Sequence, residues 1–170
     1  MGDQKLSFYE QRTIKWDRDK NAVVMIDQTL LPNELNFVAC TDVASVVDAI
    51  KTMKIRGAPA IGVAGAMGVA LSVVKANSTN KKDLLREIEP DTIALRSARP
   101  TAVNLVWGVE KVVDYVKEDL PETFDKAEAS TMVIDFVESL ADDDVKTNKK
   151  LSNLGAKLFR TGDSVLTHCN

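Results

Sequence analysis

The sequence is poor in the residues that build metal centres and disulfide frameworks. Its 170 residues include one histidine, His168, and two cysteines, Cys40 and Cys169. This set offers no metal-ligand spacing, so no metal site is expected. The start MGDQKLSFYEQR has no apolar signal-peptide region, which predicts a cytoplasmic protein with free thiols.

An excess of charge of one sign is also absent, as is a long uninterrupted apolar run. Lysine and arginine number 22 against 25 acidic residues, a formal net charge of −3. This balance argues against a nucleic-acid partner, so any anion site must be a local arrangement of a few cations and backbone amides. The longest apolar run, residues 58–74, is rich in glycine and alanine and is interrupted by Ser72, which argues against a membrane span.

Short apolar segments come first along the chain. Residues 13–16 and 22–26 flank the turn-like DRDKN and predict a β-hairpin, and NFVACT is a third extended candidate. Apolar residues at helical spacing follow. They predict a helix from Val43 through Met53, a tightly packed helix over 58–74 with glycine at every third position, and one or two short helices over 84–98 broken near Pro90. A long helix over 102–119 and one or two more over 124–159 complete the helical part, with Leu151, Leu154 and Leu158 on inner faces.

The end of the chain, DSVLTHCN, is β-branched and apolar and predicts a buried strand. A single strand cannot satisfy its own backbone groups, so its neighbours are expected in a further α/β domain. The predicted fold class is therefore α+β: a small antiparallel β region over 1–40, a helical domain over 41–160, and the first strand of an otherwise absent α/β domain over 161–170.

The segment KIRGAPAIG has the composition of an anion-binding helix start. Gly57 permits unusual dihedral angles, Pro59 suits the beginning of a helix, and Ala58 exposes its backbone amide. Such a start attracts anions, and Arg56 adds a forked cation suited to phosphate. The alternative is a plain helix connection with a solvated arginine, because the segment matches neither common nucleotide-binding pattern.

The segment LRSARPTAVNL offers Arg96 and Arg99 just before another predicted helix start at Pro100 and Thr101. Two helix starts, each preceded by an arginine, could bind one phosphate from two sides. The alternative for Arg99 is a surface or ion-paired role.

The residues of LTHCN follow the predicted strand, where open α/β sheets bind their ligands. The Cys169 thiol could act as nucleophile or acid/base there, and its alternative is a small buried apolar residue. His168 points to the opposite face of a strand from Cys169, so it is expected to be a hydrogen-bonded residue beside the site. Cys40 has no polar company and is expected to be inert.

Read together, DQTLLP, AIKTMKIRGAPAIGVAGAMGVAL, SARPTAVNLVWGVE and GDSVLTHCN resemble the methylthioribose-1-phosphate isomerase family in order and spacing. The resemblance begins near Thr13 and implies conversion of 5-methylthioribose 1-phosphate to 5-methylthioribulose 1-phosphate, with no cofactor. It implies that Arg56, Gly57, Ala58 and Arg99 hold the phosphosugar and that Cys169 is the catalytic thiol. It also implies a homodimer.

The chain departs from that family in length, because members have a second, Rossmann-like half that supplies a catalytic aspartate. The chain is therefore expected to be an amino-terminal half that is inactive without its missing carboxyl-terminal half. Two neighbouring families remain as alternatives. Ribose-1,5-bisphosphate isomerases replace APAIG with another glycine-rich sequence, and the regulatory subunits of the exchange factor for translation initiation factor two usually lack the cysteine of THCN.

Overall fold

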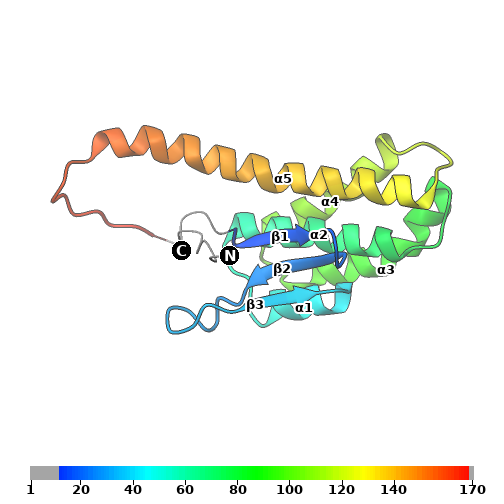
Figure 1. Ribbon diagram of the computed structural model, residues 1–170, viewed down its shortest axis with the longest axis horizontal. Helices are drawn as coiled ribbons and strands as arrows, with labels where there is room; N and C mark the ends of the chain where they lie inside the picture. Colours follow the sequence, from blue (N-terminus) through cyan, green and yellow to red (C-terminus); the bar gives the residue numbers. More distant parts are fainter. Residues whose placement is uncertain (1–11, 169–170) are drawn as a thin grey trace, which may run out of the picture.

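The computed structural model describes residues 12–168 and shows a small sheet beside a bundle of helices (Figure 1). The strands are β1 (Ile14–Asp17), β2 (Ala22–Ile26) and β3 (Phe37–Cys40). The helices are α1 (Val43–Lys51), α2 (Ala58–Lys75), α3 (Lys81–Ala98), α4 (Val103–Glu118) and α5 (Lys126–Gly155), followed by a short 3-10 turn at Ala156–Leu158. The predicted α+β class is confirmed for this part of the chain.

The three strands form an antiparallel sheet in the order β1-β2-β3. Trp16 pairs with Val23, and Val23 in turn pairs with Cys40. Asn21 has a φ of 46°, a left-handed conformation that closes the turn between the first two strands. The predicted hairpin and third strand are therefore confirmed.

Helix α2 is the centre of the core, as its glycine-rich sequence predicts. Every residue from Ile61 to Val73 is buried. By length and composition α2 is apolar enough to cross a membrane, with a mean hydropathy of 1.6 over 18 residues, but 72% of that window is buried inside the protein. The apolar surface of α2 is covered by the other helices and the sheet, as in the core helix of a globular protein.

The helix that begins at Val43 is shorter than its apolar spacing predicts. It ends at Lys51, where the N–H of Thr52 donates to the Asp48 carbonyl and the N–H of Met53 donates to the Ile50 carbonyl. Met53 follows with a φ of 61° and an exposed side chain. The prediction that Met53 lies on the inner face was therefore wrong, because the chain leaves the helix before reaching it.

Helix α3 is continuous through Pro90, so the predicted break near this residue was wrong. Proline has no N–H, so one helical hydrogen bond is lost at Pro90. Burial of Leu84, Ile88 and Leu95 stabilises the helix on both sides of Pro90, and the helix stays continuous.

Replacing Pro90 by alanine should raise the free energy of unfolding by about 2 kcal/mol, since alanine restores an N–H and a good helix former at an exposed position. Urea unfolding followed by circular dichroism measures the change. Glu89→Ala, at the exposed neighbouring position, is the matched control and should shift stability by less than about 0.5 kcal/mol. Equal stability of Pro90→Ala and the wild type would contradict this account.

Helix α5 is one helix of 30 residues, and only its first half packs on the body of the protein. Its buried residues end at Ala141. Leu151, Leu154 and Leu158, predicted to be on inner faces, are exposed, Leu158 by 80%. That prediction was wrong for the described chain, because the far end of α5 extends beyond the other elements (Figure 1).

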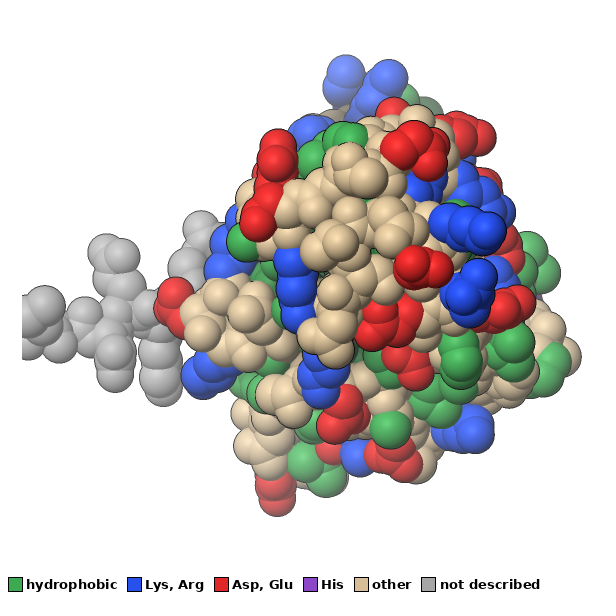
Figure 2. Space-filling model, turned by 90° about the vertical axis from the view of Figure 1, so that its right-hand side faces the viewer, with side chains coloured by type: hydrophobic (Ala, Val, Ile, Leu, Met, Phe, Trp, Pro, Cys, Tyr) green, Lys and Arg blue, Asp and Glu red, His purple; other side chains and the backbone are tan. Residues whose placement is uncertain are grey.

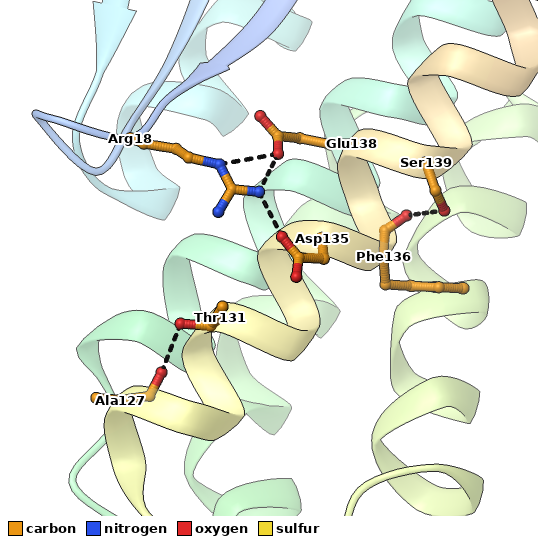
Figure 3. Close-up of polar contacts among 7 residues, drawn as sticks. All are labelled: Arg18, Ala127, Thr131, Asp135, Phe136, Glu138 and Ser139. Atoms are coloured by element: carbon orange, nitrogen blue, oxygen red, sulfur yellow. Dashed lines mark hydrogen bonds and ion pairs between the residues drawn. The ribbon is translucent and has the colours of Figure 1, made fainter.

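Two arginines on either side of β1, Arg12 and Arg18, bind the middle of α5, and Figure 3 shows the contacts of Arg18. Arg18 donates from Nε to Glu138 at 3.0 Å and also bonds Asp135. These hydrogen bonds, first that to Glu138, raise the pKa of Arg18 above its already high ordinary value. Arg12 pairs with Asp142 at 2.7 Å. The hairpin therefore holds α5 at the point where the helix leaves the core.

The segment that was predicted to be a buried strand is not a strand in residues 164–168. Its residues are exposed, and Leu166 is 98% exposed. None of the three strands in the described chain pairs with it, so its backbone groups have no ladder partner. Cys169 lies outside the described residues.

Acidic and basic side chains are interspersed on the end face that Figure 2 presents. No large area of one sign covers that face. The distribution agrees with the balanced net charge.

Candidate anion site at two helix starts

The start of α2 has the backbone geometry that the RGAP sequence predicts. Gly57 is the N-cap residue with a φ of 91°, a conformation that favours glycine. Its carbonyl accepts the first helical hydrogen bond, from the N–H of Ile61 at 2.9 Å. No side chain caps this helix. The N–H groups of Ala58 and Ala60 therefore have no acceptor within the helix and are available to an anion.

The start of α4 is similar. Its N-cap is Ala102, and it too has no side-chain cap. The helix begins at Val103, slightly later than the predicted start at Pro100 and Thr101, after a turn in which Ala102 N–H donates to the Arg99 carbonyl at 2.9 Å. Side chains do cap the other three helices, through Asp42 for α1, Asn80 for α3 and Asp125 for α5. The two helices that follow motif arginines are thus the two uncapped ones among those described.

The two uncapped starts lie beside each other. A Cβ atom on Gly62, in the second turn of α2, would stand 2.9 Å from the carbonyl oxygen of Asn104, in the first turn of α4. One turn further, Gly65 meets Leu105 and Val109. The contacts advance along both helices together, so α2 and α4 begin at the same end of the molecule. The positive ends of the two helix dipoles therefore point in a common direction.

The arginines of the two motifs differ in their surroundings. Arg96 pairs with Glu110 at 2.7 Å, and it also donates to Thr92, so its charge is engaged within the helices. Within residues 12–168, neither Arg56 nor Arg99 forms an ion pair. Arg56 is exposed just before α2, and Arg99 is the half-buried residue that ends α3. These two guanidinium groups therefore have no acidic partner among the described residues, whereas the cavities beside α2 are lined by the cationic residues Arg12 and Lys111.

No hydrogen bond or ion pair joins the described end of the chain, residues 164–168, to this site. His168 is exposed in an extended segment and makes no hydrogen bond to the other described residues. Cys169 lies outside them. Within the described residues, the structure therefore builds Gly57, Ala58 and the two helix starts into one region.

Two adjoining cavities open beside the start of α2. A small one of about 190 Å³ is lined by Gly57, Pro59 and Ala60 with residues of β1 and α5. A larger one of about 620 Å³ shares Pro59 with it and extends along α4 past Asn104 and Trp107. Concave sites of this size with apolar walls and a few polar groups commonly hold small ligands.

The residues of the larger cavity were not among those that the sequence predicted. Trp107 is about half exposed, and the Lys111 ammonium lies 6.0 Å from its ring centre. Asn104 is in the first turn of α4. The sequence did carry a signal for these cavity residues. Asn104 and Trp107 are one helical turn apart in SARPTAVNLVWG and so lie on one face of the predicted helix.

The comparison with known families identifies the family of this chain. Residues 54–170 match the initiation factor 2 subunit family, and the chain belongs to that family. The matched region covers α2, α4 and the segment with LTHCN.

Among its relatives is the methylthioribose-1-phosphate isomerase of Alkalilimnicola ehrlichii, 38% identical over 159 residues that cover 94% of this chain and 44% of the relative. The crystal structure of 5-methylthioribose 1-phosphate isomerase from Pyrococcus horikoshii is similar with a TM-score of 0.77 at 34% identity. It covers 87% of this chain and 40% of the other. The translation initiation factor eIF-2B delta subunit from A. fulgidus is similar with a TM-score of 0.79 at 37% identity, over 94% and 45%. The chain thus spans less than half the length of these relatives.

Proposed function

We propose that this chain is the phosphosugar-binding part of an isomerase that converts 5-methylthioribose 1-phosphate to 5-methylthioribulose 1-phosphate. The observation that carries the proposal is the pair of adjacent, uncapped helix starts, each preceded by an arginine without an ion pair in the described chain. The names of the Alkalilimnicola and Pyrococcus relatives give the substrate.

The chemistry assigns distinct tasks to these groups. Backbone N–H groups of Gly57 and Ala58, with Arg56 and Arg99, would hold the phosphate and so fix the sugar. The phosphate blocks the anomeric carbon, so the ring must open before a hydrogen can move from C2 to C1. An acid/base pair is needed for that transfer, and Cys169 supplies one member of it. We propose no cofactor, because the reaction rearranges one molecule without net oxidation.

A carboxyl-terminal half would complete the site. We infer that it is Rossmann-like, supplies a catalytic aspartate and pairs its strands with residues 161–170. Two observations support this: the relatives are more than twice as long as the matched region, and an exposed row of leucines follows the packed part of α5. Leu151, Leu154 and Leu158 are spaced to face one side of a helix. A cytoplasmic homodimer of the completed protein stays a prediction.

An activity assay tests the proposal directly. The 170-residue chain is assayed for the phosphosugar conversion alone and mixed with the part of the Alkalilimnicola ehrlichii relative outside its matched region. Turnover is expected only in the mixture. Robust turnover by the chain alone would remove the need for a second half. A mixture that associates by gel filtration yet converts nothing would reject the isomerase function.

The anion site is tested on the chain itself by nuclear magnetic resonance. Inorganic phosphate should shift the amide signals of Gly57, Ala58 and Ala60. Arg56→Ala and Arg99→Ala should each weaken phosphate binding by about tenfold, the effect of losing one charge-assisted hydrogen bond. Arg86→Ala is the matched control, because Arg86 is an exposed arginine on α3 whose one ion pair within residues 12–168 is with Asp83. If all three variants lose phosphate affinity equally, the loss comes from the change in net charge and not from contacts at the helix starts.

The likeness to the eIF-2B delta subunit favours a second candidate, a regulatory protein that binds other proteins. A third is isomerisation of ribose 1,5-bisphosphate. Competition separates them. A regulatory chain should not distinguish phosphosugars from inorganic phosphate, and a bisphosphate isomerase should bind ribose 1,5-bisphosphate more tightly than 5-methylthioribose 1-phosphate.

A further inference from the structure

The motif DQTLLP forms a tight turn after β2 that lies against the α2 start. Asp27 is 9% exposed, and its Oδ1 accepts hydrogen bonds from the Thr29 N–H at 3.0 Å and the Thr29 hydroxyl at 2.6 Å. The Asp27 N–H donates to the carbonyl of Asn36 on the far side of the loop. These bonds fix the backbone on both sides of Gln28, so Gln28 has a defined direction.

Gln28 binds the segment before α2 twice. Its backbone N–H donates to the Lys54 carbonyl at 2.9 Å, and its side-chain Nε2 donates to the Arg56 carbonyl at 3.2 Å. The Lys54 carbonyl belongs to the same peptide unit as the Ile55 N–H. That N–H donates to the Ala49 carbonyl of α1. The chain from Lys54 to Gly57 is therefore held from β2 and from α1.

The bond to the Arg56 carbonyl also sets the direction of the next amide. The carbonyl of Arg56 and the N–H of Gly57 belong to one planar trans peptide unit, in which they point in opposite directions. When Gln28 binds the carbonyl, the Gly57 N–H is turned away from Gln28. Glycine at this position has wide conformational freedom, so without such a bond this peptide unit could rotate.

We propose that Gln28 is a positioning residue for the anion site, holding the Arg56–Gly57 peptide so that the Gly57 N–H faces the bound phosphate. This inference rests on the proposed function, since it concerns the same phosphate. It assigns a role to the DQT sequence, which touches no predicted substrate-binding side chain. Preorganised donors bind an anion more tightly because binding then costs less ordering of the backbone.

The test compares Gln28→Leu with the wild-type chain in the phosphate titration. Leucine keeps the approximate volume and the backbone bond to Lys54 but removes the side-chain donor. Phosphate binding should weaken about threefold to tenfold, with the Gly57 amide signal changed most in the free chain. Asn36→Ala is the matched control, because among the described residues the Asn36 side chain donates to Glu34 alone, in the same loop. It should bind phosphate as the wild type does.

Gln28→Glu adds a readout that loss of stability alone would not produce. An ionised carboxylate repels the Arg56 carbonyl, whereas a protonated one can donate to it. Affinity relative to the wild type at the same pH should therefore be low at pH 7 and recover toward pH 4, near the usual carboxyl pKa of about 4.3.

The outcomes separate the two claims. Failure of the wild-type chain to bind phosphate at the α2 start rejects the proposed anion site and this inference together. Wild-type binding with undiminished affinity in Gln28→Leu rejects the positioning role alone. If Gln28→Leu does not fold, the pH profile of Gln28→Glu decides, and a relative affinity that does not change between pH 7 and pH 4 rejects the role.

Discussion

Replacing Gly108 by alanine is expected to lower the free energy of unfolding by about 3 kcal/mol, at the upper end of what an added methyl group costs in a packed core. The added Cβ would stand 2.0 Å from the Gly62 carbonyl oxygen and 2.8 Å from its carbon. Both atoms belong to the backbone of α2, so no side chain can rotate to make room. The two helices would have to separate, and the packing of Leu105 and Val109 would loosen with them. Urea unfolding followed by circular dichroism gives the change.

Gly155→Ala is the matched control for this substitution. Gly155 ends α5 with an ordinary helical φ of −63°, and nothing lies within 4 Å of an added Cβ. Alanine should be neutral there, or raise stability by up to about 1 kcal/mol, through helix propensity alone. If both variants were equally stable, α2 and α4 would not be in the close contact described.

If the proposed function is right, replacing Cys169 by serine is expected to reduce turnover by the chain and its complementing half by about 100-fold or more, the usual contribution of a positioned acid or base. A serine hydroxyl is a far weaker acid than a thiol, so it transfers a proton poorly at neutral pH. The KM should change little, because the proposed phosphate contacts come from Arg56, Arg99 and the helix starts. Steady-state kinetics of the mixture with the complementing half provides the measurement.

Cys40→Ala serves as the control for that experiment. Cys40 is fully buried at the end of β3, and burial raises the pKa of its thiol, so the thiol stays protonated and unreactive at neutral pH. Its replacement should leave turnover nearly unchanged. Near-normal turnover in Cys169→Ser would return that residue to a packing role.

Local pattern was sufficient where the residues themselves determine the structure. The hairpin of β1 and β2 follows from two short apolar runs around a polar turn, and the burial of α2 follows from its composition. Local sequence pattern gave wrong predictions where contacts with residues far apart in the sequence determine the structure. Pro90 remains inside a helix because buried residues on both sides of it belong to the core. Leu151, Leu154 and Leu158 are exposed because the buried residues of α5 end at Ala141.

Some features of the candidate site were likewise predictable from local sequence, and others depend on contacts between distant segments. The RGAP and SARP sequences predict two helix starts with arginines, and the positive φ of Gly57 agrees with its expected role. That the two starts lie side by side depends on Gly62 and Gly108 meeting across α2 and α4, which no local pattern reveals. The link from Gln28 to Arg56 joins residues 28 positions apart and was equally invisible.

The single long helix α5 also has a mechanical consequence. Its 30 residues extend about 45 Å, and roughly 20 Å of this length lies beyond the contacts of Arg12 and Arg18 with Asp135, Glu138 and Asp142. A tilt of about 10° at these ion pairs would carry the far tip sideways by about 4 Å over that length. A small change in the angle of α5 at these two surface arginines therefore displaces the far end of the helix, and any segment attached to it, by several ångströms.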